Sequence, residues 1–308
     1  MTTLTRRQAL VSGAALPLAA LIPSSMNAAG HSAPQAAALP QFRDFVLGDF
    51  EVTTLLAGSR PVPEPHKTFG LNVDEATFNA VSEQNFIPAD VAQFFFTPTI
   101  INTGSEVILF DTGLDPAGIT AALTAAGYAT DDVTHVVLTH MHGDHIGGMA
   151  DDTGALTFGN AAYITGQTEF DHWAGQENDG FYAKVRPFAD RFTFLSDQGE
   201  VRSGISAVFA PGHTPGHMAF RVESGGKQLL LMADTANHYV YSLAYPEWEV
   251  RFDADKAQAA ATRKTLLDTA AADRMAVIGY HMPFPGLGFV ETRGEGGYHY
   301  VPHSYQLM

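Results

Sequence analysis

Residues 139–148 (THMHGDHIGG) place four potential metal ligands within six positions: His140, His142, Asp144 and His145. His140 and His142 are two residues apart, so on extended backbone their side chains point to the same side. The other two donors follow within a turn. Because neutral imidazole is the commonest metal ligand in proteins, this spacing predicts a metal site built largely by one short loop.

Three further donors, His213, Asp234 and His281, each follow an apolar segment that is typical of a buried strand. Asp234 ends its strand, where a carboxylate without a metal or hydrogen-bond donors would be costly to bury. The chain has no cysteine, so imidazole and carboxylate must supply every ligand. Such a ligand set suits zinc, manganese, iron or cobalt.

The HxHxDH core and these three later residues together resemble the metallo-β-lactamase superfamily, from roughly Phe45 to the C-terminus. The resemblance implies an α/β fold, an αββα four-layer sandwich, that holds two divalent metal ions, expected to be zinc. It also implies the ligands: His140, His142 and His213 for the first ion, Asp144, His145 and His281 for the second, and Asp234 as a bridge between them.

Within that superfamily the resemblance narrows further. True β-lactamases of the commonest subclass carry cysteine at the position of Asp234, and glyoxalase II proteins usually add a basic helical region at the C-terminus. Here the tail after His281 is rich in proline and glycine, and it resembles the methyl parathion hydrolase branch with its lactonase and arylesterase relatives. The expected reaction is cleavage of lactones, aryl esters or organophosphate triesters by a hydroxide that bridges the metals. Asp234 and Asp144 are the expected catalytic carboxylates, Asp234 also as proton acceptor.

The same resemblance implies that the aromatic residues Trp173, Phe181 and Phe284 line the substrate pocket. Asp111 ends another apolar segment, and we expect it to orient a ligating histidine rather than to bind metal. His217 lies four residues beyond His213 but is outside the ligand pattern, so we expect it not to be a ligand.

Strands and helices alternate along the chain, which predicts an α/β layered domain. The ligands follow directly after predicted strands, where a rigid scaffold presents functional residues on loops. Strands are expected within residues 45–56, 97–104, 107–110, 133–139, 162–165, 205–209, 218–223, 228–232 and 275–279, and helices over 116–127, 167–173 and 253–272.

The N-terminus has the order of an export signal. Two arginines, Arg6 and Arg7, precede an uncharged stretch from Ala9 to Ile22 that is too short to cross a bilayer comfortably. We expect a twin-arginine-like signal peptide over residues 1–30, a linker over 31–40 and a single hydrolase domain over 41–308. The mature protein is expected in the periplasm or secreted, without stable membrane insertion.

The formal net charge of −16 disfavours nucleic acid as a partner and suits a small neutral ester or lactone as substrate. Relatives of this kind are often dimers, which makes a homodimer possible, but the sequence itself leaves the oligomeric state open. Three alternatives stay open. They are a glyoxalase II-like thioester hydrolase, an exported metal-binding protein without catalysis, which would prefer a closed site, and an iron oxidoreductase that uses fewer ligands.

Overall fold

The structure is a computed structural model, and it describes residues 40–304. The predicted signal peptide and all but the last residue of the predicted linker lie outside the described residues. Within residues 40–304, no helix is long and apolar enough to cross a membrane.

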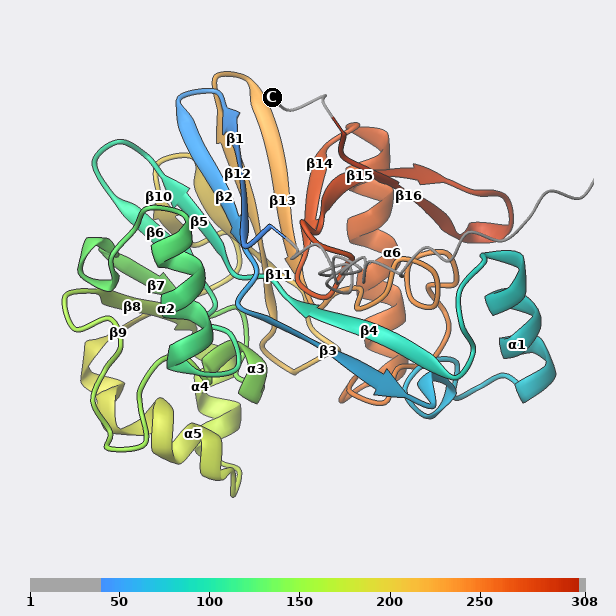
Figure 1. The fold of residues 1–308 in the computed structure, drawn as a ribbon, viewed down its shortest axis with the longest axis horizontal. Coiled ribbons are helices and arrows are strands. Elements are labelled where there is room, and N and C mark those ends of the chain that lie inside the picture. The colour runs from blue at the N-terminus through green and yellow to red at the C-terminus, as the bar shows by residue number, and fades with distance from the viewer. Residues whose placement is uncertain (1–39, 305–308) are drawn as a thin grey trace, which may run out of the picture. The chain divides into compact units, whose positions relative to one another are not determined.

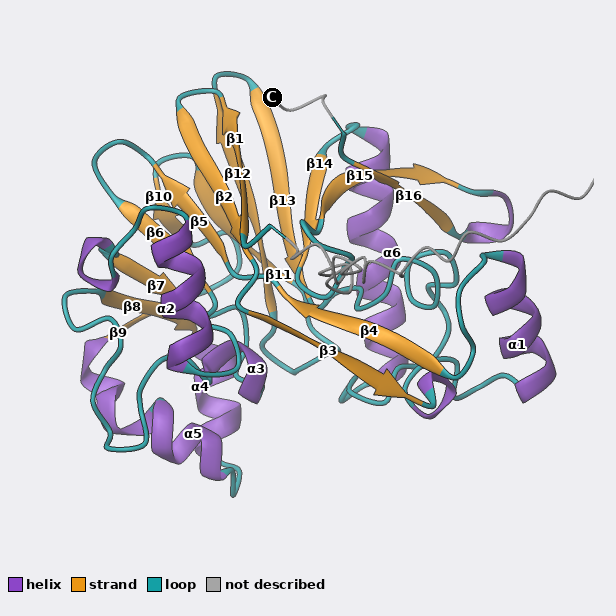
Figure 2. Cartoon of the chain, viewed as in Figure 1, coloured by secondary structure: helices purple, strands orange, loops and turns teal. Residues whose placement is uncertain are grey.

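Two seven-stranded mixed sheets and a separate two-stranded ribbon form the framework of the described part (Figures 1 and 2). The first sheet contains, in spatial order, β1 (Phe42–Leu47), β2 (Phe50–Leu55), β5 (Thr99–Asn102), β6 (Val107–Phe110), β7 (His135–Val137), β8 (Ala162–Gly166) and β9 (Phe192–Leu195). The second contains β10 (Glu200–Arg202), β11 (Ile205–Phe209), β12 (Met218–Ser224), β13 (Lys227–Ala233), β14 (Ala276–Gly279), β15 (Leu287–Thr292) and β16 (Tyr298–Pro302). The ribbon pairs β3 (Gly58–Pro63) with β4 (Val91–Phe96).

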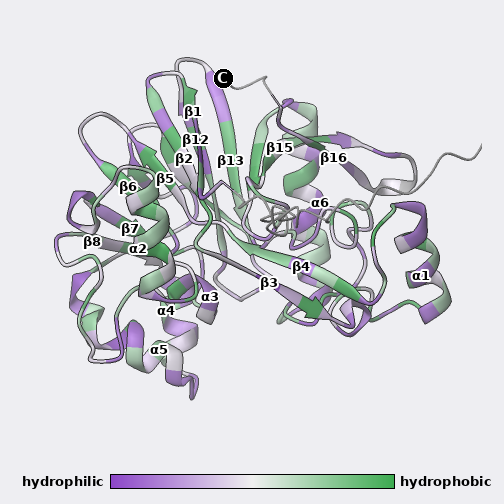
Figure 3. Cartoon of the chain, in the orientation of Figure 1, coloured by the Kyte–Doolittle hydropathy of each residue, from purple (hydrophilic) through white to green (hydrophobic). Residues whose placement is uncertain are grey.

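Helices cover the outer faces of both sheets. The α-helices of the described part are α1 (Glu75–Gln84), α2 (Pro116–Ala125), α3 (Gly143–Ile146), α4 (Gln167–Ala174), α5 (Asp179–Lys184) and α6 (Lys256–Ala272). Of these, α1 packs in a separate apolar cluster with β4 and not on either large sheet. Figure 1 shows α2, α4 and α5 beside the first sheet and α6 beside the second. Figure 3 shows green, hydrophobic stretches along β6, β13 and β15, whereas α1 carries both green and purple, as an amphipathic helix does.

Three apolar layers hold this arrangement together. The middle layer joins the two sheets, and it includes Ile108 and Val137 from the first with Phe220 and Leu231 from the second. A second layer packs the first sheet against α2, α4 and α5, and a third packs the second sheet against α6. The order helix, sheet, sheet, helix confirms the predicted αββα four-layer sandwich.

Most of the strands that lead into the predicted ligands were predicted within one or two residues of their observed bounds. The strand β3 was not predicted, and it continues through Pro61 to Pro63 although proline usually interrupts a strand. The reason is that β3 pairs with β4 only, so a proline nitrogen on its open side gives up no ladder hydrogen bond. The hairpin of β15 and β16 was also missed, because glycine and proline dominate the sequence around it.

The predicted helix 253–272 begins later than expected. Asp255 caps α6, since its carboxylate accepts a hydrogen bond from the Gln258 N–H at 2.9 Å. Asp253 consequently lies outside the helix, where it is free to contact the site described next.

Candidate metal centre

The loop after β7 carries the motif of residues 139–148, and contacts with neighbouring segments fix its shape. Asp111, which follows the parallel strand β6, accepts hydrogen bonds from the Thr139 N–H and hydroxyl, both at 2.9 Å. The two glycines that end the motif allow close packing, because a Cβ on Gly147 would lie 2.0 Å from the Leu114 carbonyl oxygen. These contacts bend the chain so that successive ligand side chains converge.

The three predicted ligands of the first ion converge in the structure. The Nδ1 atom of His142 lies 3.1 Å from Nε2 of His140 and 2.9 Å from Nε2 of His213. Nitrogen ligands at 2.0–2.1 Å from a tetrahedral zinc ion lie about 3.3 Å from one another. His213 comes from the loop after β11, so the second sheet completes a group that the first sheet begins.

The three predicted ligands of the second ion also converge. Oδ2 of Asp144 lies 3.9 Å from Nε2 of His145 and 3.3 Å from Nε2 of His281, which follows β14. Asp234, at the end of β13, lies between the two groups. Its carboxylate oxygens are 3.3 Å from Nε2 of His213, 3.3 Å from Nε2 of His145 and 3.2 Å from Nε2 of His281.

Two polar atoms in this cluster are buried without a hydrogen-bond partner among the described residues: Nε2 of His145 and Oδ1 of Asp234. Leaving such atoms unpaired in the interior is unfavourable. The two atoms lie 3.3 Å apart, and a divalent cation with imidazole and carboxylate ligands would satisfy both. The donor set therefore fits two metal ions.

The electrostatics of the cluster without metal also fit this assignment. Burial lowers the pKa of His140 well below its usual value and that of His142 to about 3, so both rings are neutral and ready to bind metal. Burial opposes ionisation of Asp234, but His281 and His145 outweigh it and hold the pKa of Asp234 well below its usual value. Burial also opposes the charged form of His281, yet Asp234 and Asp144 raise its pKa to about 9.

A second set of contacts orients the ligand rings. The Nδ1–H of His145 donates to Asp111 at 2.8 Å, that of His213 donates to Asp253 at 2.9 Å, and that of His281 donates to the Phe95 carbonyl oxygen at 2.9 Å. Each bond selects the tautomer that leaves Nε2 available to a metal. Asp111 therefore orients the ring of His145, as predicted, and its backbone is in the left-handed region with φ 61°.

His217 lies near the ligands but serves another purpose. Its Nδ1–H donates to the Ala210 carbonyl oxygen at 3.1 Å, and its Nε2 accepts from the Asp234 N–H at 3.1 Å. Both ring nitrogens are therefore occupied by backbone groups. This agrees with the prediction that His217 is not a ligand, and it helps to hold Asp234 after Ala233, whose φ is 43°.

The ion pair behind His213 was not predicted. Asp253 also accepts from the Arg263 guanidinium at 2.9 Å, and Arg263 donates further to the carbonyl oxygens of Thr235 at 2.7 Å and Pro246 at 2.8 Å. Arg263 is only 1% exposed although it lies on α6. It therefore ties this helix to the segment that follows Asp234 and, through Asp253, to His213.

Replacement of Arg263 with methionine is expected to lower the free energy of unfolding by about 3–5 kcal/mol, because the buried Asp253 loses its cationic partner. Urea denaturation followed by circular dichroism measures this change. The double variant Asp253→Asn/Arg263→Met should recover part of the loss, since no unpaired buried charge remains. A single variant as stable as the parent would contradict this view of the pair.

Glu169 is the other residue that the sequence did not reveal. This α4 side chain is fully buried, and its Oε1 accepts from the Met141 N–H at 3.0 Å and from the Trp173 indole at 2.6 Å. Its Oε2 accepts from the Thr214 hydroxyl at 2.6 Å and the Gly216 N–H at 3.1 Å. Burial raises the pKa of Glu169, while these four bonds to the carboxylate oppose the shift. Glu169 thus links both loops that carry ligands of the first group.

The three aromatic residues predicted to line the pocket lie in different environments. Trp173 is half-buried, and its ring meets the His142 ring edge-on with centroids 5.6 Å apart. The prediction for Phe181 was wrong, because this side chain is fully buried and packs against Phe170 on the helix side of the first sheet. Phe284 is half-buried in the loop after His281, and its role as a pocket wall stays a prediction.

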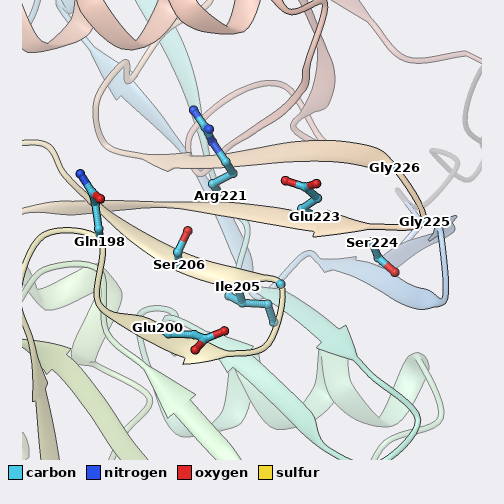
Figure 4. Close-up of a pocket in the computed structure, with 10 residues that line it drawn as sticks. Gln198, Glu200, Ile205, Ser206, Arg221, Glu223, Ser224, Gly225 and Gly226 are labelled. Carbon is cyan, nitrogen blue, oxygen red and sulfur yellow. The ribbon is translucent and has the colours of Figure 1, made fainter.

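A pocket of about 530 Å³ is shown in Figure 4, and it is lined by residues of β10, β11, β12 and their turns, including Glu200, Arg221 and Glu223. None of the candidate metal ligands lines it. Its surface carries both carboxylates and a guanidinium, so it does not present charge of one sign to a ligand. We therefore place the chemistry at the histidine cluster.

Comparison with known proteins supports the same location. The metallo-beta-lactamase superfamily matches residues 97–281, a range that includes all seven candidate ligands. This chain belongs to the metallo-beta-lactamase superfamily. The predicted superfamily is thereby confirmed, while nothing in the comparisons singles out its methyl parathion hydrolase branch.

Several members of the superfamily are similar to this chain. An N-acyl homoserine lactonase from Bacillus thuringiensis is 29% identical over 118 residues, which cover 38% of this chain and 43% of that protein. The chain thus spans less than half the length of this curated relative. The structure of AidC, a dizinc quorum-quenching lactonase in complex with a product, N-hexanoyl-L-homoserine, has a TM-score of 0.77 and 26% identity. That match covers 86% of this chain and 98% of AidC. The hydrolase AbOPH shares the fold, with a TM-score of 0.80 at 21% identity over 87% and 99% of the two chains.

Proposed function

We propose that this chain is a two-metal hydrolase that opens lactones. The observation that carries the proposal is the position of Asp234, whose carboxylate lies 3.2–3.3 Å from ligand nitrogens of both groups. A single carboxylate that reaches two groups is the arrangement that a two-metal site requires. The similarity to a dizinc lactonase over 86% of the chain supports lactones as the substrate class.

Zinc is the ion we propose for both positions. His140, His142 and His213 would hold one ion, Asp144, His145 and His281 the other, and Asp234 would contact both. When bound, two such ions activate a water molecule and polarise the carbonyl oxygen of the substrate.

The chain's own residues contribute position and proton transfer. Asp234 is ionised and fixed by the Asn237 amide, which donates to Oδ2 at 2.9 Å, while Oδ1 is left without a donor. Oδ1 is therefore the oxygen that is open to a metal ion, and the carboxylate held in this way is the candidate to accept a proton from an attacking water. Trp173, whose ring meets that of His142 edge-on, would limit the access of bulk water to this side of the cluster.

The test is a side-by-side assay of the mature protein loaded with zinc, manganese or cobalt. The substrates are dihydrocoumarin, an acyl-homoserine lactone, paraoxon and S-lactoylglutathione, and chelator-treated protein is the control. We expect turnover of the lactones that depends on metal. Turnover of the glutathione thioester alone would favour the glyoxalase II alternative, and tightly bound metal without any turnover would favour a metal-binding protein.

Aryl esters and organophosphate triesters are secondary candidates. A triester resembles the lactone in being neutral, and the chain's net charge of −16 offers no cationic clamp for an anionic substrate. Paraoxon turnover in the same assay would support them.

A further inference from the structure

A cavity of about 230 Å³ lies on the β4 side of the metal-ligand cluster. Two of its walls are anchored to candidate ligands. One wall includes Phe95, whose carbonyl oxygen accepts the hydrogen bond from His281. Another is the segment from His238 to Tyr241, directly after Asn237, which donates to Asp234. We call this space the β4 cavity.

The lining of the β4 cavity is apolar for the most part. Aliphatic and aromatic side chains dominate it, among them Ile87, Val91, Phe95, Tyr239, Tyr241 and Pro283. No aspartate, glutamate, lysine or arginine lines it. Its volume is below the range of about 300–1,000 Å³ that is typical of pockets for whole small molecules. The cavity therefore suits an uncharged, apolar part of a substrate.

Gln93 and His238 add polar groups to this lining, and His238 is held in a single orientation. Its Nδ1 accepts hydrogen bonds from the N–H groups of Val240 at 3.1 Å and Tyr241 at 3.2 Å. The ring stacks on Tyr239 and on Tyr241, with centroids 4.8 and 4.3 Å apart. Burial lowers the pKa of His238 to about 3, so the ring is neutral.

These contacts determine where the ring proton is. A nitrogen that accepts two N–H groups carries no hydrogen, so the proton of the neutral ring is on Nε2. His238 is 7% exposed, yet Nε2 is not sealed from solvent and donates to no protein atom within residues 40–304. His238 lines the β4 cavity, and from this we infer that the N–H faces that space.

We propose that the β4 cavity binds the acyl substituent of an acylated lactone, with the Nε2–H of His238 donating to the carbonyl oxygen of that substituent. The hydrocarbon chain would lie against Ile87, Val91 and Tyr239, while the lactone ring reaches the metal-ligand cluster. This inference rests on the proposed lactonase function. It adds the prediction that the acyl group, and not only the ring, is recognised.

The central variant is His238→Asn, measured on zinc-loaded protein of equal metal content. The asparagine oxygen can still accept the two backbone N–H groups, but no donor remains at the position of Nε2. We expect KM for N-hexanoyl homoserine lactone to rise about 3–10-fold, the size of one neutral hydrogen bond. KM for γ-butyrolactone, which has no acyl substituent, should change less than about twofold.

Two further variants separate this effect from general damage. Val91→Phe fills the cavity from a side chain that is 37% exposed, and it should weaken the hexanoyl substrate but not γ-butyrolactone. His299→Asn, on the exposed side of β16, is the matched control and should change neither. Equal effects of His238→Asn on both substrates, or no effect on either, would overturn the proposal.

Binding of the product N-hexanoyl-L-homoserine, followed by calorimetry, needs no turnover. If the parent protein hydrolyses no lactone but binds this product, and His238→Asn weakens the binding, the proposed function fails while the acyl site stands. If the parent hydrolyses lactones and His238→Asn binds the product as tightly as the parent, the acyl site fails and the proposed function stands.

Discussion

Replacement of Asp234 with alanine is expected to reduce bound metal from two ions per chain to one or none. It is also expected to lower kcat/KM for a lactone by more than about 100-fold. The carboxylate lies within 3.3 Å of ligand atoms in both groups, so its loss weakens both positions together. Loss of a residue that only hydrogen-bonds to a metal ligand, without binding the metal itself, already weakens metal binding or activity by about 10–100-fold. Metal content is measured by mass spectrometry after gel filtration, and activity with dihydrocoumarin.

The matched control is Asp197→Ala, a carboxylate of the described chain whose contact is the exposed Phe209 N–H. It should keep two ions and full activity. Two tightly bound ions and full activity in the Asp234→Ala variant would refute the two-metal assignment. Loss of one ion with the affinity for the other ion unchanged would mean that Asp234 serves only one group.

Replacement of Glu169 with glutamine should weaken one of the two metal positions by about 10–100-fold and leave the other nearly unchanged. Four donors face the carboxylate, two on each oxygen, and the amide nitrogen of glutamine cannot accept from either pair. The unpaired donors should also lower the free energy of unfolding by about 1–3 kcal/mol. Zinc competition with a chromophoric chelator separates the two positions, and urea denaturation of the metal-free protein measures the stability.

Thr214→Val provides the graded comparison, because it removes one of the four donors and leaves the charge of Glu169 in place. It should weaken metal binding less than Glu169→Gln does. If Glu169→Gln destabilises the fold but leaves both zinc affinities unchanged, Glu169 supports only the structure. If both positions weaken equally, its link to the first group is wrong.

The parts of the site that could be predicted from the sequence are those that depend on local spacing. Four donors within residues 140–145 must converge wherever the chain turns, and the apolar runs before His213, Asp234 and His281 predict the strands that present them. Each of these residues lies where the prediction placed it, next to its expected neighbours.

The parts that could not be predicted depend on contacts between distant segments. Glu169 appears in the sequence as an ordinary polar residue of a short helix, and only packing shows that four donors surround it. Arg263 lies on a helix whose sequence is typical of an amphipathic helix, yet it is buried and contacts three separate points of the connection between β13 and α6. His238 has no spacing relation to the other histidines, because its importance lies in two backbone bonds and a cavity. The prediction for Phe181 was wrong because an aromatic residue close to a site in the sequence can belong to the hydrophobic core as readily as it can line the pocket.

Each ligand group takes members from both sheets. His140 and His142 follow β7 while His213 follows β11, and Asp144 and His145 lie opposite His281 after β14. Metal ions bound there would cross-link the two sheets, since the sheets could not separate without breaking bonds between metal and ligand. A ligand present at a thousand times its dissociation constant stabilises a fold by about 4 kcal/mol. The supply of metal would then determine resistance to proteolysis as well as activity. A metal-free chain would be degraded rather than persist as inactive protein.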